Sequence, residues 1–320
     1  MTEPQQKLTD LAPSEWFEEP DKSSIWITAY RIMFADKEKL KNGQLYDFSN
    51  LRVILIYGKL QYLETSHIKP EIDNDGNVKL DANINNTETP EGGWLIILQP
   101  YVIDGAESTE YKIRVNAGIY AALYAAMNGR NMAFERVVDN IAALKDGKTS
   151  ASSPSFINPG AFPVPNVSKD RCEVIHKAGI ILQQKPDNDR RRIELSLHWF
   201  EKGIRSMGLD GFVNYWIAIE TLGMPDTTNI RPLNQSLAKA YGITLEEATN
   251  IFGMGKIFGF RSRILHNGED LPINQLLSEY MECIFVDILL EYLSLDSERK
   301  AINVLERQEF NLDRLVHITA

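Results

Sequence analysis

The sequence has few cysteines and no long apolar run. Its two cysteines, Cys172 and Cys283, match neither a zinc spacing nor a redox C-x-x-C pair. No segment reaches about 18 uninterrupted apolar residues, so no membrane-spanning helix is expected. The first twenty residues lack the basic and then apolar stretches of a signal peptide. We therefore expect a protein of the reducing cytoplasm that has no membrane partner.

Several common catalytic motifs are also missing. The glycine-rich segment 253–259, GMGKIFG, lacks the G-x4-G-K-[ST] pattern of a phosphate-binding loop. Neither a G-x-S-x-G nucleophile elbow nor an H-E-x-x-H zinc motif occurs, and the five histidines show no metal-ligand spacing. The sequence therefore gives no reason to expect a metal or a cofactor.

The charge balance excludes a broad basic surface. Lysine and arginine number 34 against 44 acidic residues, which gives a formal net charge of −10. Such a chain is a poor non-specific binder of nucleic acid, so any RNA contact must come from a local site. The short run Arg190, Arg191 and Arg192 has two interpretations, a contact to a phosphate backbone or, more commonly, a solvated helix start.

Length and composition predict two globular domains. The chain has 320 residues and is 43% hydrophobic, enough for two separate cores. Residues 146–170 are rich in serine, glycine and proline, which neither a helix nor a central strand tolerates. We interpret this segment as a linker between a domain at residues 1–145 and a domain at residues 171–320.

The N-terminal domain is predicted to be a small α+β unit. Residues 25–34, 51–63 and 94–103 are rich in β-branched and aromatic side chains, as strands are. Residues 72–93 are full of turn formers, which favours a hairpin tip or an exposed loop. Apolar residues then recur at near-helical spacing over residues 111–144. These patterns do not indicate a function.

The C-terminal domain is predicted to be an all-α helical bundle. Asp210 is a candidate N-cap, and Thr244 with Glu247 forms a capping-box pattern. Asn267 and Gly268 form a helix stop. Amphipathic patterns predict helices over residues 190–207, 211–222, 244–252, 258–266 and 271–295.

Two predicted helices carry the residues that could take part in a reaction. Arg261, Arg263 and His266 crowd the end of the helix over residues 258–266. The otherwise apolar helix over residues 211–222 carries a single acidic residue, Glu220. A lone carboxylate in such a stripe is costly unless it is exposed or paired, and Arg261 or Arg263 is a natural partner.

These segments resemble the HEPN superfamily, most closely its Apea-like branch. The resemblance rests on the tryptophan- and alanine-bearing helix segment over residues 216–222 and on an R-x4-H motif formed by Arg261 and His266. A small polar residue after the arginine, here Ser262, is common in that family. The resemblance covers about residues 189–295 and implies a HEPN-like bundle that forms a homodimer with the two motifs facing each other.

The resemblance implies a metal-independent RNA endonuclease of the toxin or phage-defence kind. RNA supplies its own 2′-hydroxyl nucleophile, so cleavage needs a proton-transfer group, here His266, and a cation for the phosphate, here Arg261. The products would be a 2′,3′-cyclic phosphate and a free 5′-hydroxyl. Glu220, Ser262, Arg263 and Asn267 are expected in supporting roles. The expected partners are RNA such as tRNA and an antitoxin or trigger protein, which residues 1–145 would sense.

Simple helix geometry disagrees with this family pattern. A regular helix places Arg261 about 140° around the axis from His266 but Arg263 only about 60° away. Arg263 is therefore expected to be the nearer neighbour, unless Arg261 acts across a dimer or the last turn of the helix is distorted, and Arg261 is kept as the first choice for the phosphate. His266 also has a structural interpretation, because a histidine beside a helix C-terminus interacts favourably with the helix dipole. A non-catalytic dimerisation module, or one that binds RNA or protein, is thus the competing function.

Overall fold

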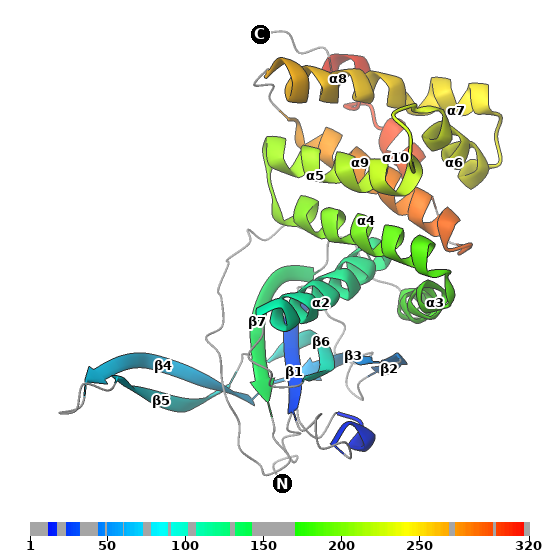
Figure 1. Ribbon diagram of the computed structural model, residues 1–320. Coiled ribbons are helices and arrows are strands. Elements are labelled where there is room, and N and C mark those ends of the chain that lie inside the picture. The colour runs from blue at the N-terminus through cyan, green and yellow to red at the C-terminus, as the bar shows by residue number, and fades with distance from the viewer. Residues whose placement is uncertain are drawn as a thin grey trace. The chain divides into compact units, whose positions relative to one another are not determined.

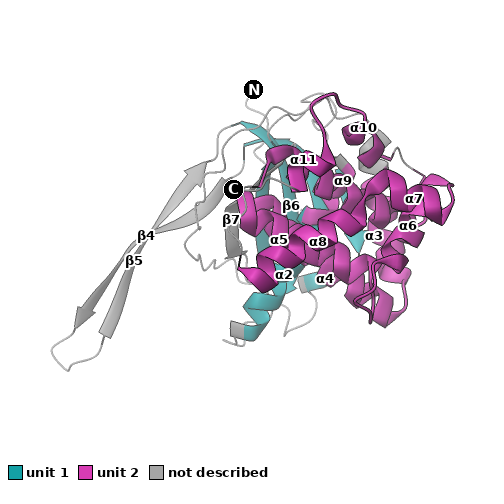
Figure 2. Ribbon diagram, turned by 90° about the horizontal axis from the view of Figure 1, so that it is seen from above, with its two compact units in different colours: residues 1–121, 128–169 teal, residues 122–127, 170–320 magenta. Residues whose placement is uncertain are grey.

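The computed structural model describes most of the chain as two compact units (Figure 2). The described residues are 12–17, 24–32, 44–48, 50–59, 61–72, 78–88, 91–101, 107–128, 132–142, 170–268, 273–296 and 299–316. One unit contains residues 1–121 and 128–169, and the other contains residues 122–127 and 170–320. Apart from Asp170, the predicted linker over residues 146–170 lies outside the described residues, so its role stays a prediction.

Unit 1 is built on an antiparallel sheet of five strands in the order β2-β3-β6-β1-β7 (Figure 1). Its strands are β1 (Ser24–Ile32), β2 (Gln44–Phe48), β3 (Leu51–Gly58), β6 (Gly92–Tyr101) and β7 (Met132–Ala142). The strands β4 (Gln61–Ile72) and β5 (Val78–Glu88) pair only with each other, as a separate two-stranded ribbon. The α+β character predicted for this part of the chain is confirmed.

Successive side chains of each strand point to opposite faces of the sheet, and apolar residues form a core on each face. On one face Trp26 and Tyr101 pack with Ile113 of the helix α2 (Glu107–Asn128). Gln99 is buried there and donates its side-chain N–H to the Ile113 carbonyl at 2.9 Å. The opposite face is apolar and includes Trp94, with Trp16 of the short 3-10 helix η2 (Ser14–Phe17) packed against it.

One prediction for unit 1 is wrong, and another covers too many residues. The helix predicted over residues 111–144 ends at Asn128, and β7 follows it as a partner of β1. The β-branched Val137, Val138 and Ile141 suit that strand better than a helix. The hairpin predicted as one alternative for residues 72–93 is present as the antiparallel pair β4 and β5, but the predicted tip is too long, because Val78–Glu88 pairs its backbone with β4 as the strand β5.

Unit 2 is helical, as predicted, and no strand occurs in its described residues. Helices α4 and α5 run antiparallel as close neighbours, and α5 also packs on α9 (Figure 1). Its helices are α3 (Asp170–Gln184), α4 (Asp187–Arg205), α5 (Gly208–Gly223), α6 (Arg231–Tyr241), α7 (Leu245–Phe252), α8 (Met254–Asn267), α9 (Gln275–Tyr292), α10 (Ala301–Leu305) and α11 (Leu312–Val316).

Aromatic rings fill the core of unit 2 between α4, α5 and α9. Phe200 stacks on Phe285 with ring centroids 4.3 Å apart, and Tyr215 lies beside Phe200 at 5.7 Å. A Cβ atom at Gly203 would lie 2.7 Å from the Tyr215 ring, so glycine is what allows α4 and α5 to approach this closely.

Helix ends in unit 2 follow local sequence signals with two exceptions. The capping box of Thr244 and Glu247 is present, and Gly268 ends α8 with a left-handed φ of 67°. Asp210 is not the N-cap of α5, because Met207 occupies that position and Asp210 lies in the first turn. Helix α8 begins at Met254 rather than near residue 258, directly after the left-handed Gly253 that ends α7.

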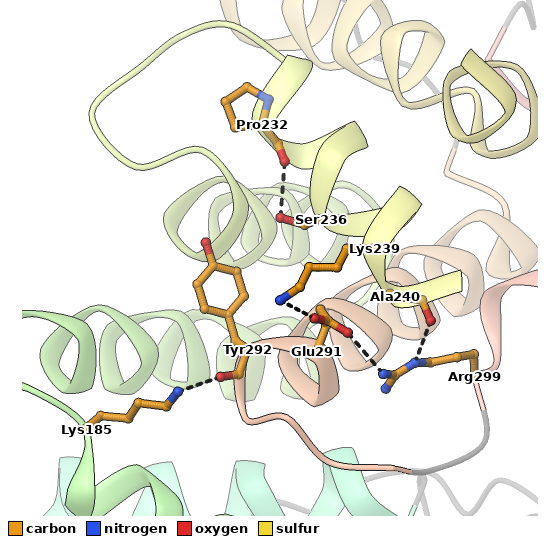
Figure 3. A network of polar contacts seen from close by, with 8 residues as sticks. All are labelled: Lys185, Pro232, Ser236, Lys239, Ala240, Glu291, Tyr292 and Arg299. Atoms are coloured by element: carbon orange, nitrogen blue, oxygen red, sulfur yellow. Dashed lines mark hydrogen bonds and ion pairs between the residues drawn. The ribbon is translucent and has the colours of Figure 1, made fainter. Parts of the chain in front are cut away.

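A polar network joins the ends of several helices in unit 2 (Figure 3). The Glu291 carboxylate on α9 pairs with Lys239 of α6 at 2.6 Å and with Arg299 at 3.5 Å. Arg299 also donates to the Ala240 carbonyl at 3.2 Å. Lys185, between α3 and α4, donates to the carbonyl of Tyr292 at 2.8 Å. Segments far apart in the sequence are thereby held together.

No helix in the described part of the chain is long and apolar enough to cross a membrane.

A buried carboxylate, Asp287, organises the start of α10. It accepts hydrogen bonds from the Tyr241 hydroxyl at 2.5 Å and from the backbone N–H groups of Lys300 and Ala301 at 2.9 and 2.8 Å. Its side chain is fully buried, and burial raises the pKa of Asp287 above the usual aspartate value, against the lowering effect of these hydrogen bonds. Asp287 therefore replaces the solvent that would otherwise satisfy these helix N–H groups.

The substitution Asp287→Ala should destabilise unit 2 strongly. It leaves the partly buried Tyr241 hydroxyl and Lys300 N–H and the buried Ala301 N–H without their acceptor, which costs about 2–4 kcal/mol of unfolding free energy. Urea denaturation followed by circular dichroism measures this loss. The exposed Asp296 provides the matched control, because Asp296→Ala should change the unfolding free energy by less than about 0.5 kcal/mol. Equal effects of the two substitutions would contradict the role of Asp287.

Candidate functional site

The candidate site lies at the C-terminal end of α8, which aromatic contacts hold against α5. Phe260 meets Phe212 edge to face at 5.3 Å, and Phe258 lies 5.8 Å from the Trp216 ring. Phe212, Trp216 and Phe260 are buried. This packing fixes which side of α8 faces the core and leaves His266, in its last turn, exposed.

A continuous polar chain runs from α5 to the end of α8. The indole N–H of Trp216 donates to Glu220 Oε2 at 2.9 Å. The same oxygen lies 3.6 Å from Nη2 of Arg261, and Nη1 of Arg261 lies 3.3 Å from Nε2 of His266. The carboxylate thus anchors the guanidinium, and the guanidinium in turn contacts the imidazole.

The expectation that Arg263 is the nearer neighbour of His266 is wrong. Arg261 contacts the imidazole, whereas Arg263 points toward the C-terminal segment and donates to the Val316 carbonyl at 3.3 Å. The azimuth of the Cα atoms misled the prediction, because an arginine side chain is long enough to reach along the helix surface to the next turn. Arg261 is also the partner of Glu220, which sequence reasoning had left open between the two arginines.

The predicted site residues Ser262 and Asn267 lie outside the chain of contacts from Trp216 to His266. The Ser262 hydroxyl donates to the backbone carbonyl of Phe258 at 3.0 Å, which is a local helix contact. Asn267 is the exposed last residue of α8, directly before the left-handed Gly268. The structure therefore brings together Glu220, Arg261 and His266, while Ser262 and Arg263 bond to backbone carbonyls.

The Arg261 contact constrains the protonation of His266. A guanidinium only donates hydrogen bonds, so an imidazole nitrogen bonded to it must carry a lone pair. A hydrogen bond from Arg261 to Nε2 of His266 requires Nε2 to be the acceptor and the neutral ring to carry its proton on Nδ1. In this arrangement His266 is prepared to take up a proton at Nε2 once Arg261 moves to another acceptor.

An open pocket of about 1090 Å³ adjoins the same carboxylate. Glu220 lines it, together with residues from the start of α4, the second half of α5 and the turn over residues 224–228. Sequence reasoning missed this pocket, because its wall comes from three separate segments that share no motif. Among the described residues, no group of three His, Cys, Asp or Glu side chains is arranged to hold a metal ion.

Comparison with known proteins adds no further assignment. No protein-family model, curated protein or solved structure matches the chain.

The tautomer of His266 is directly testable. When its imidazole is neutral, wild-type His266 should carry its proton on Nδ1. Long-range ¹H–¹⁵N correlation spectra distinguish the two tautomers. The variant Arg261→Ala should shift His266 toward the Nε2-protonated form, and Arg263→Ala should leave it unchanged. A wild-type ring protonated on Nε2 would show that the Arg261 contact does not persist in solution.

Proposed function

We propose that this protein is a metal-independent RNA endonuclease in which Arg261 and His266 act together. The observation that supports the proposal most is the 3.3 Å contact between Arg261 Nη1 and His266 Nε2 at the exposed end of α8. It places a permanent cation and a proton acceptor side by side, which are the two groups that cleavage by an internal 2′-hydroxyl requires.

The proposed reaction begins when an RNA phosphate displaces the imidazole as the acceptor for Arg261. The guanidinium then binds two phosphate oxygens, a geometry that arginine favours. Nε2 of His266 becomes available and takes the proton of the 2′-hydroxyl as its oxygen attacks phosphorus. The P–O5′ bond breaks, which leaves a 2′,3′-cyclic phosphate on one product and, once the leaving oxygen is protonated, a 5′-hydroxyl on the other.

Glu220 has a positioning role in this proposal. It holds Nη2 of Arg261 at 3.6 Å while its own orientation is fixed by Trp216, so the guanidinium starts close to its working position. The HEPN resemblance of residues 189–295 adds that two copies form a homodimer with their motifs facing each other. A protein of this kind would act on cytoplasmic RNA such as tRNA, as a toxin or in phage defence, and residues 1–145 would respond to a trigger or an antitoxin.

A second candidate is a non-catalytic helical module that dimerises or binds RNA or protein. The contacts that favour it are the hydrogen bond of Arg263 to the Val316 carbonyl and the ion pair of Arg261 with Glu220, because both of them fasten α8 to other segments of unit 2. In that case the chain from Trp216 to His266 stabilises a helix end and performs no chemistry.

Single substitutions on α8 separate these functions. His266→Ala should lower the rate of RNA cleavage in EDTA by about 10²–10⁴-fold, because it removes the proton acceptor. Arg261→Ala should cause a comparable loss, and Arg263→Ala, the matched control, should stay within a few-fold of wild type. The rate is measured on total RNA and on tRNA, with circular dichroism to verify folding. Equal cleavage by wild type and His266→Ala, or none by either in the presence of cell extract, would favour the non-catalytic module.

A further inference from the structure

The pocket beside Glu220 has no role in the cleavage step proposed above. Its volume of about 1090 Å³ is at the upper end of the range for small-ligand sites and large enough for a nucleotide. Its wall combines the apolar side chains of Leu195 and Ile217 with the hydroxyl-bearing Thr221 and Thr228. Leu195 is 49% exposed, so its apolar side chain is open to a ligand.

Glu220 connects this pocket to the candidate site. Its Oε2 atom is engaged by Trp216 and Arg261, but no described residue donates a hydrogen bond to Oε1. The side chain is 29% exposed and forms part of the pocket wall. A ligand in the pocket that carries an N–H group can therefore donate to this carboxylate without displacing Arg261.

The remaining charges of the pocket favour a ligand that has both N–H donors and a phosphate. Arg192 pairs with Asp189 at 3.0 Å, so these two charges offset each other. Arg191 is exposed and forms no hydrogen bond or ion pair with any described residue, which leaves a cation for a phosphate. Asp226 adds another carboxylate, so the pocket is not a general anion site.

We infer that the pocket binds a nucleotide of the RNA strand next to the scissile phosphate and selects a base with an exocyclic amino group. This inference rests on the proposed nuclease function and deepens it. The amino group of adenine, cytosine or guanine donates to Glu220 Oε1, the ring lies on Leu195 and Ile217, and a strand phosphate binds Arg191. Uracil presents carbonyl oxygens where the other bases present the amino group, and its single N3–H donor lies between these two oxygens, which repel the carboxylate.

The test measures binding separately from cleavage. Fluorescein-labelled octamers of adenosine, cytidine and uridine with 2′-fluoro sugars carry no 2′-hydroxyl and so cannot be cleaved. Wild type should bind the adenosine and cytidine strands roughly ten-fold more tightly than the uridine strand, the effect of one hydrogen bond to a charged group. Glu220→Gln should reduce this preference to about two-fold, because an amide also offers a donor to uracil.

Arg191 and Leu195 test the other two contacts. Arg191→Ala should weaken the binding of all three octamers. It should also reduce the magnitude of the negative slope of log affinity against log salt concentration by about 0.7. Arg314→Ala, at an exposed arginine of α11 outside the pocket, should leave the slope unchanged. Leu195→Gln, at an exposed position that tolerates a polar side chain, should weaken binding without altering the slope, and it replaces Glu220→Gln if that variant does not fold.

The outcomes distinguish this inference from the nuclease proposal. Equal affinity for the three strands in wild type, or affinities that none of the pocket substitutions changes, would overturn the inference even in an active nuclease. Base-selective binding that depends on Arg191 and Leu195, combined with no cleavage of matching ribo-octamers, would instead retain the pocket as an RNA site and refute the nuclease. Cleavage and base-selective binding together would support both proposals.

Discussion

The candidate site depends on how the Glu220 carboxylate is satisfied on an otherwise apolar helix. A charge in this position needs partners, and α5 supplies one from its own preceding turn, the Trp216 indole, while α8 supplies the other, Arg261. Aromatic packing between the two helices brings these groups within reach of each other. Because the arginine is held from one side, its other amino group reaches His266. The arrangement of the side chains at the C-terminal end of α8 thus depends on one partly buried carboxylate, that of Glu220.

The ion pair itself adds little stability. The side chains of Arg261 and Glu220 are 19% and 29% exposed, and at such exposure water screens the attraction to about 1 kcal/mol or less. The contact between Arg261 and His266 is more exposed still. A weak interaction suits a site in which the guanidinium must change acceptor when a phosphate arrives. The stability of unit 2 comes instead from the stacked core around Phe200 and from the capping carboxylate of Asp287.

Local sequence signals predicted the helix ends around the site. The ion-pair partners, the strand β7 and the pocket depend on contacts between distant segments, so they could not be predicted from the sequence. The capping box at Thr244 and the Asn267-Gly268 stop depend on a few neighbouring residues, so they could be identified from the sequence. The pairing of Glu220 with one of two arginines depends on how α5 and α8 cross, which no local pattern encodes. Likewise, the strand after α2 has near-helical apolar spacing, and its pairing with β1 decides its structure. The pocket at Glu220 requires three separate segments to meet, so no sequence pattern indicated it.

The net charge of −10 is compatible with an RNA substrate only if the positive charge is concentrated locally. Arg261 and Arg191 provide such local cations, because the former lies at the end of α8 beside His266 and the latter at the neighbouring pocket. In this account the strand is held by a few specific contacts and not by a wide basic face. Affinity should accordingly depend weakly on salt and strongly on the residues of these two sites.

The most direct measurement of the central claim is an analysis of the ends of the RNA products formed in EDTA. Attack by the 2′-hydroxyl should give 2′,3′-cyclic phosphates and 5′-hydroxyls, and no cleavage of the same strand when its sugars lack the 2′-hydroxyl. Products with 5′-phosphates, or cleavage that persists on the 2′-deoxy strand, would contradict attack by the 2′-hydroxyl and with it the assigned roles of Arg261 and His266.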